Sequence, residues 1–130
     1  MKKLIIILFL LIGISSYSQT RLGYSYSQIK NEFSLYPCST GINEWGVFWL
    51  QVELDGCTVV YGFDDSYICN SSIIIPDNQG MLNTYVQNYN NQYVIISQTE
   101  WNMYSSGGIL RIQLFYTEDG GYYFLWTRKL

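Results

Sequence analysis

Apolar and polar residues alternate most regularly from Val47 to Asp64, where the dipeptide Asp55-Gly56 separates two alternating runs. Asp-Gly favours a two-residue type I′ turn, so the segment is predicted to form a β-hairpin in which Leu54 pairs with Cys57. That register also pairs Val52 with Val59, Leu50 with Tyr61 and Phe48 with Phe63. One face is then entirely apolar, and the other carries Val47, Trp49, Gln51, Glu53, Thr58, Val60 and Asp64. A slip of one residue would exchange the faces, so the turn and the alternation favour the same register.

Two other segments have the spacing of amphipathic helices. Ser25 forms a capping-box pattern with Gln28, and the apolar side chains that follow are Tyr26, Ile29 and Phe33. Pro37 is expected to end this first helix. The second helix is predicted to begin after Asp77 as its N-cap, with an apolar stripe of Leu82, Tyr85, Val86 and Tyr89.

The remaining chain has the alternation and turn residues of strands, predicted at 67–75, 93–104, 109–117 and 122–127. The expected order is helix-strand-strand-strand, repeated twice. It predicts an α+β fold with an antiparallel sheet of about six strands and both helices on one face. A weak internal repeat agrees with that order, since Trp45 precedes Tyr61-Gly-Phe-Asp-Asp65 much as Trp101 precedes Phe115-Tyr-Thr-Glu-Asp119.

The first 18 residues have the pattern of a cleaved export signal. Lys2 and Lys3 precede an apolar run from Leu4 to Ile14, and the small residues Ser16 and Ser18 fit cleavage before Gln19. The run is short for a membrane anchor, which is the alternative interpretation. We therefore expect residues 1–18 to be a signal peptide, residues 19–130 to be a single domain, and the mature protein to be secreted or periplasmic and free of the membrane.

Composition excludes several classes of function. The chain has 13 Tyr, 6 Phe and 4 Trp but no His, which removes the usual general base and the commonest metal ligand. Loss of Lys2 and Lys3 with the signal would change the formal net charge from -3 to -5. No run of basic residues remains, so nucleic acid is not an expected partner. We predict that the protein is not an enzyme and holds no metal or cofactor.

Cys38, Cys57 and Cys69 would enter an oxidising compartment if the chain is exported. A disulfide is predicted between Cys38 and Cys69 or between Cys57 and Cys69, and three reduced, buried thiols are the alternative. A catalytic thiol is not expected, because no histidine is present to act as its base.

Carboxylates occur in pairs at Asp64-Asp65 and Glu118-Asp119, and Glu44 and Glu100 stand close to tryptophans. Two carboxylates about 5 to 9 Å apart can hydrolyse a glycosidic bond, so a glycoside hydrolase is the alternative function. The simpler interpretation is that turn carboxylates accept hydrogen bonds from neighbouring backbone groups.

The aromatic residues suggest a binding surface. With Asp119-Gly120 at the centre of the last turn, Leu114 and Tyr116 pair with Leu125 and Tyr123 towards the core. The side chains predicted on the other face of the sheet, as candidate ligand-binding residues, are Trp49, Arg111, Phe115, Phe124 and Trp126. Such residues suit a protein, peptide or glycan partner. Alternatively, the N-terminal segment, a long loop or a homodimer covers this face.

Several short segments resemble a group of short exported Bacteroidetes proteins without an assigned activity. The similar segments are the opening Leu22-Gly23-Tyr-Ser25, Tyr61-Gly-Phe63, Cys69, Leu82-Asn83 with Tyr85-Val86, and Trp101. Separately, Gly23-x-Ser25-x-x-x-Ile29 resembles the duplicated helix-plus-sheet modules of β-lactamase-inhibitor-like and outer-membrane-assembly proteins, although Tyr36-Pro37-Cys38 replaces their usual Gly-x-Pro. The second resemblance implies a binding module. The expected function is therefore a secreted or periplasmic, non-enzymatic binding module, with an envelope immunity-type protein as a further alternative.

Overall fold

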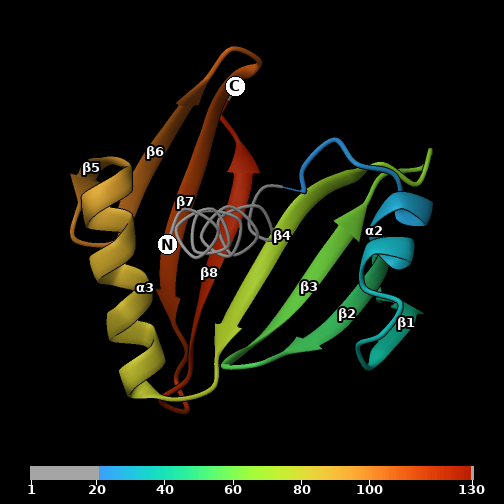
Figure 1. Cartoon of the computed structure of the whole chain (residues 1–130), viewed down its shortest axis with the longest axis horizontal. Coiled ribbons are helices and arrows are strands. Elements are labelled where there is room, and N and C mark those ends of the chain that lie inside the picture. The colour runs from blue at the N-terminus through green and yellow to red at the C-terminus, as the bar shows by residue number, and fades with distance from the viewer. Residues whose placement is uncertain (1–20, 130) are drawn as a thin grey trace, which may run out of the picture.

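The computed structural model describes residues 21–129, which form two helices and one eight-stranded antiparallel sheet (Figure 1). The elements are α2 (Tyr26–Glu32), β1 (Cys38–Ile42), β2 (Phe48–Leu54), β3 (Cys57–Phe63), β4 (Cys69–Pro76), α3 (Gln79–Gln92), β5 (Val94–Ser97), β6 (Glu100–Ser105), β7 (Gly108–Tyr116) and β8 (Tyr122–Arg128). In space the strands follow the order β1-β2-β3-β4-β8-β7-β6-β5. Residues 21–129 thus contain two units of one helix and four strands, joined where β4 pairs with β8.

The predicted α+β class and antiparallel sheet are confirmed, but the sheet has eight strands instead of about six. Cys38–Ile42 was not among the predicted strands, yet it pairs with β2 as the edge strand β1. Residues 93–104 were expected to form one strand and instead divide into β5 and β6. The repeated unit is therefore one helix followed by four strands.

The predicted hairpin register and helix cap of the first unit are confirmed. Leu54 pairs with Cys57, and the rest of the predicted hairpin register holds through Phe48 and Phe63. Ser25 and Gln28 form the predicted capping box at α2, each side chain accepting the backbone N–H of the other residue. The second helix begins one residue later than expected, because the side chain of Asn78, and not Asp77, accepts the N–H of Met81.

Both helices pack on the same face of the sheet, α2 over the first unit and α3 over the second (Figure 1). That face is continuous across the junction of the units, because Ile74 on β4 pairs with Val59 on one side and with Phe124 on the other. The helix residues that pack on this face are fully or almost fully buried: Ile29 from α2, and Leu82 and Tyr89 from α3. The opposite face has no helix over it within residues 21–129.

The predicted export signal, residues 1–18, lies outside the described residues and stays a prediction. Within residues 21–129, neither helix is long and apolar enough to cross a membrane.

Candidate functional site: the open face of the sheet

The face of the sheet opposite the helices, here called the open face, carries side chains in regular rows across the strands. Its central row runs from β2 to β7 and comprises Gln51, Val60, Ile73, Leu125 and Gln113. The three apolar members of this row are half-buried between their neighbours, and one glutamine flanks them on each side. The open face thus has an aliphatic centre with amide groups at its margins.

Aromatic side chains lie at two places on the open face. Trp49 on β2 lies between two cross-strand glycines, Gly41 and Gly62, and its ring fills the space that a side chain at Gly41 would need. Phe115 and Tyr123 on β7 and β8 are stacked, with their ring centroids 5.3 Å apart and the ring planes inclined by 25°. Trp49 and Phe115 are therefore on the predicted face.

A pair of opposite charges lies on the open face between β6 and β7. The Arg111 Nε lies 3.9 Å from a Glu100 carboxylate oxygen, and both side chains are partly exposed. Asn102, the cross-strand partner of Arg111, is 2% exposed. In the amide orientation that satisfies both of its ends, Asn102 accepts from the Lys129 Nζ at 3.2 Å and donates to the Trp101 carbonyl at 3.3 Å. Arg111 is thus on the predicted face, within a polar margin.

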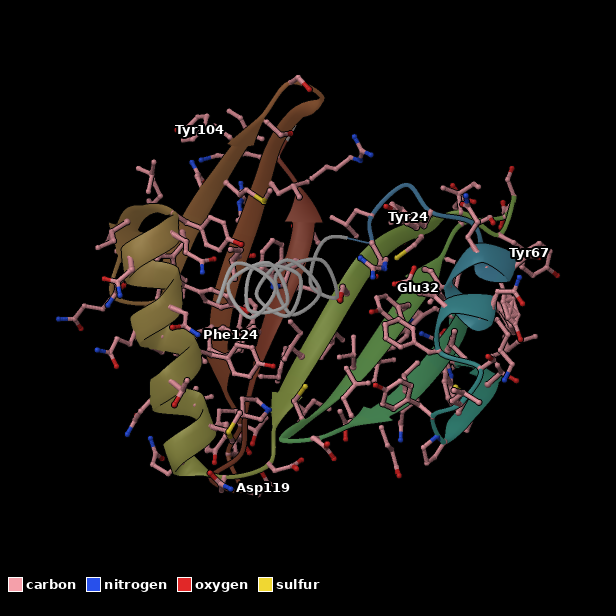
Figure 2. All side chains as sticks on the ribbon, in the orientation of Figure 1. Tyr24, Glu32, Tyr67, Tyr104, Asp119 and Phe124 are labelled. Atoms are coloured by element: carbon pink, nitrogen blue, oxygen red, sulfur yellow. The ribbon has the colours of Figure 1, made fainter. Side chains whose placement is uncertain are left out.

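The predicted placement of Phe124 and Trp126 on the open face is wrong. Both side chains have no exposed area, and Figure 2 shows Phe124 between α3 and the sheet. The Tyr89 ring contacts both of them, with centroid distances of 5.0 Å to Phe124 and 5.7 Å to Trp126. These two residues belong to the core and are not available to a ligand.

The error comes from the length of the last turn. Thr117 donates its N–H to the Gly121 carbonyl, and Gly120 donates its N–H to the Thr117 carbonyl. The loop therefore has three residues, 118–120, instead of the predicted two-residue centre. Gly120 has a φ of +86°, a conformation that favours glycine. The longer loop pairs Leu114 with Phe124 in place of Leu125, and this one-residue shift exchanges the faces of β8.

The shift places Tyr123 and Leu125 on the open face, where sequence reasoning did not put them. Tyr116 was also expected in the core, but it lies at the end of β7 and is 65% exposed. The signal that could have corrected the register is the Thr-Glu-Asp-Gly-Gly run at residues 117–121, because a glycine at the third loop position is typical of a three-residue hairpin loop.

The predicted disulfides are wrong, because all three cysteines are free. Cys57 pairs with Pro76 at one end of the β3–β4 hairpin and Cys69 pairs with Phe63 at the other. Six residues of strand separate those ends, about 20 Å at the usual rise, far beyond the reach of a disulfide. Cys38 is on β1 and is separated from β4 by two intervening strands, so it cannot reach Cys69 either.

The two buried thiols are poor nucleophiles. Burial raises the pKa of Cys69 to about 12, and a backbone hydrogen bond with Ser71 acts in the opposite direction. Burial also raises the pKa of Cys57, although the Tyr85 hydroxyl, which donates to its sulfur at 3.2 Å, acts in the opposite direction. Because the thiolate is the reactive form, these surroundings favour a structural role for both residues.

The candidate carboxylates lie apart. Glu44 is in the β1–β2 loop and Glu100 is on β6, so five strand spacings, about 24 Å, separate them. The turn carboxylates accept backbone hydrogen bonds, as the simpler interpretation predicted: Asp64 from Ser66 and Ile68, and Asp119 from Gly121. Asp119 lies in the β7–β8 loop (Figure 2). Its pKa is lowered mainly by the hydrogen bond from the Thr117 hydroxyl and, to a smaller extent, by the Gly121 N–H. Glu44 and Glu100 therefore cannot flank one glycosidic bond.

Two hollows of about 290 Å³ each lie away from the open-face centre. One lies at the β6–β7 end, between Leu22, Met103 and Arg128, and the other lies between α3 and Tyr116. Both are at the lower limit for small-molecule sites. Within residues 21–129, no cluster of three or more Cys, Asp or Glu side chains is arranged to hold a metal ion.

Comparison of the chain with protein-family models, curated proteins and solved structures finds no match. The open face is therefore interpreted from its own chemistry.

Proposed function

We propose that this protein is a non-enzymatic binding module, secreted or periplasmic, whose open sheet face binds a protein partner. The observation that carries the proposal is the central row of Val60, Ile73 and Leu125. These residues lie on three adjacent strands, on the face of the sheet that neither helix covers. Such an apolar centre with a polar margin is the usual anatomy of a protein interface.

The chemistry of the face favours protein over the other predicted partners. A glycan needs many polar groups for its hydroxyls, whereas the centre of the open face offers aliphatic side chains. Aromatic anchors at both ends, Trp49 and the Phe115–Tyr123 stack, are residues that contribute strongly to protein binding. Arg111 and Glu100 at the margin would select the orientation of a partner more than they would add affinity.

The proposal can be tested by capture from envelope extract with immobilised protein lacking residues 1–18. Val60→Lys places a charge in the middle of the open face, and Asn31→Lys places the same charge on the exposed side of α2 as a matched control. We expect a defined protein to be retained by the wild type and by Asn31→Lys, and to be lost with Val60→Lys. Both variants must keep the circular-dichroism spectrum of the wild type.

Equal retention by Val60→Lys and the wild type would contradict the proposal, because the bound protein would then use another surface. Retention of polysaccharide instead of protein, with the same dependence on Val60, would support the open face as the binding surface but would show that the partner is a glycan and not a protein.

A further inference from the structure

A second surface of the molecule has the features of an interface, and it is distinct from the open face. β5 is the last strand at one edge of the sheet, paired only with β6, and no strand within residues 21–129 covers its outer side. Its three apolar residues are about half exposed: 50% for Val94, 56% for Ile95 and 48% for Ile96. An edge strand of this kind presents free backbone hydrogen-bonding groups beside apolar side chains.

The two edges of the sheet differ in composition. β1, at the opposite edge, has Ser39, Thr40 and Gly41 at its centre, and Pro37 precedes it. β5 has no lysine, no proline and no inward-facing charge, which are the usual devices against edge-to-edge pairing, and only a register irregularity between Ile95 and Ser97 interrupts it. The β5 edge is therefore the less protected of the two.

The distribution of charge indicates which partner could bind at this edge. Residues 78–99, which comprise all of α3 and β5, contain no charged side chain, although acidic residues exceed basic ones in the chain as a whole. Two copies of an acidic protein repel each other over most of their surfaces. At this edge they can approach without placing like charges together.

The flank of α3 adds a second self-complementary feature. β5 and the C-terminal end of α3 lie at the same corner of the molecule (Figure 1). The exposed residues in the C-terminal half of this helix include Gln87 and Asn91. An amide side chain both donates and accepts hydrogen bonds, so identical amides can pair across a twofold axis.

From these observations we infer that β5 pairs antiparallel with β5 of a second copy of this chain, joining two eight-stranded sheets into one. A twofold axis near Ile95 places Val94 of one copy opposite Ile96 of the other, so apolar residues face apolar residues. The α3 helices of the two copies then lie on the same side of the joined sheet. Because β5 has only four residues, the dimer is expected to be weak and dependent on concentration.

Sedimentation velocity from about 1 μM to about 1 mM, the range in which small interfaces dissociate, tests this inference. We expect the chain without residues 1–18 to shift from monomer to dimer across that range. Ile95→Lys should raise the dimer dissociation constant by at least about tenfold, because two lysines would meet at the axis. Thr40→Lys, the same charge on the β1 edge, should leave the constant unchanged.

Hydrogen exchange provides a readout that does not depend on a variant. In the wild type, the amides of residues 94–97 should exchange more slowly at high protein concentration than at low concentration, and those of residues 38–42 should not change. A wild type that stays monomeric to about 1 mM would overturn the inference, as would a dimer that Ile95→Lys does not weaken. In the first case, an extended segment of another protein becomes the better occupant of the edge. The outcome is independent of the open-face test, which probes Val60.

Discussion

The indole N–H of Trp126 donates a hydrogen bond to the hydroxyl of Tyr89 at 3.3 Å, and both side chains are buried. This hydrogen bond links α3 to β8 within the second unit. A second tryptophan repeats the arrangement, because the Trp101 indole donates to the Asn90 Oδ1 at 2.8 Å. The aromatic excess of the chain is therefore concentrated in part in helix-to-sheet contacts, where each indole N–H has a partner.

Trp126→Ala is expected to lower the free energy of unfolding by about 3 to 5 kcal/mol, because it removes a fully buried ring and leaves a cavity. Trp49→Ala, on the half-buried open face, should cost only about 1 to 2 kcal/mol. Urea denaturation of the two variants measures the difference. Equal losses would show that the open face is covered in the folded protein.

Gly120→Ala should destabilise the protein by about 1 to 2 kcal/mol, since an L-residue with a Cβ resists a φ of +86°. Gly107→Ala is the matched control. Neither position has an atom within 4 Å of an added Cβ, and Gly107 has no positive φ. Thermal melting of both variants gives the comparison. If the two variants melt at the same temperature, the three-residue loop of the β7–β8 hairpin is not formed as described.

Stability should fall as pH rises above about 9. An unfolded cysteine ionises near its ordinary pKa of 9.0, whereas burial holds the pKa of Cys69 in the folded protein at about 12. The folded state therefore binds the additional proton in this window, and each such group can lower stability by about 1.4 kcal/mol per pH unit. Burial raises the pKa values of Cys57 and Tyr61 as well, so their effects have the same sign.

Urea denaturation at pH 8 and at about pH 10, where an unfolded thiol is largely ionised, measures this loss. Cys69→Ala should lose less stability between the two pH values than the wild type does. An identical loss in both proteins would mean that Cys69 is exposed to solvent or titrates normally.

The three cysteines should differ in their rates of alkylation. Cys38 is only partly buried, and its sulfur is near the Tyr36 carbonyl, 3.3 Å away, at the surface, so it should react with iodoacetamide before Cys57 and Cys69. Intact mass of the native protein should show one rapid addition, and unfolding without reductant should expose two more. Fewer than three additions after unfolding would indicate a disulfide.

The first hairpin could be predicted fully, because Asp55-Gly56 permits one common two-residue turn and a second register would bury Glu53. The last hairpin could not be predicted with the same rule. Its loop contains Gly120 and Gly121, which accommodate either two or three loop residues, and that difference of one exchanges Phe124 with Leu125. The open face was thus predicted as the candidate site, but two of the five residues predicted to lie on it belong to the core.

The edge strand β1 was missed, and β5 was predicted as part of one long strand with β6, for a different reason. A central strand shows alternation because one of its faces is buried, whereas an edge strand with few buried side chains carries little such pattern. Cys38–Ile42 contains two small polar residues and a glycine, and Val94–Ser97 is exposed along its whole length. Both strands form because a neighbouring strand offers hydrogen bonds, and a single-segment pattern does not contain that information.

The junction of β4 with β8 has a consequence for how the molecule is assembled. β8 is the last of the eight strands along the chain, yet it lies in the middle of the sheet, more than 45 residues from its neighbour β4. Each unit can form its own local hairpins early, but the two halves can join only after Trp126 and its neighbours have been synthesised. Closing so long a loop is entropically slow, so the rate-limiting step of folding should be this late union, and a chain that stops before Tyr122 would leave two half-sheets with open central edges.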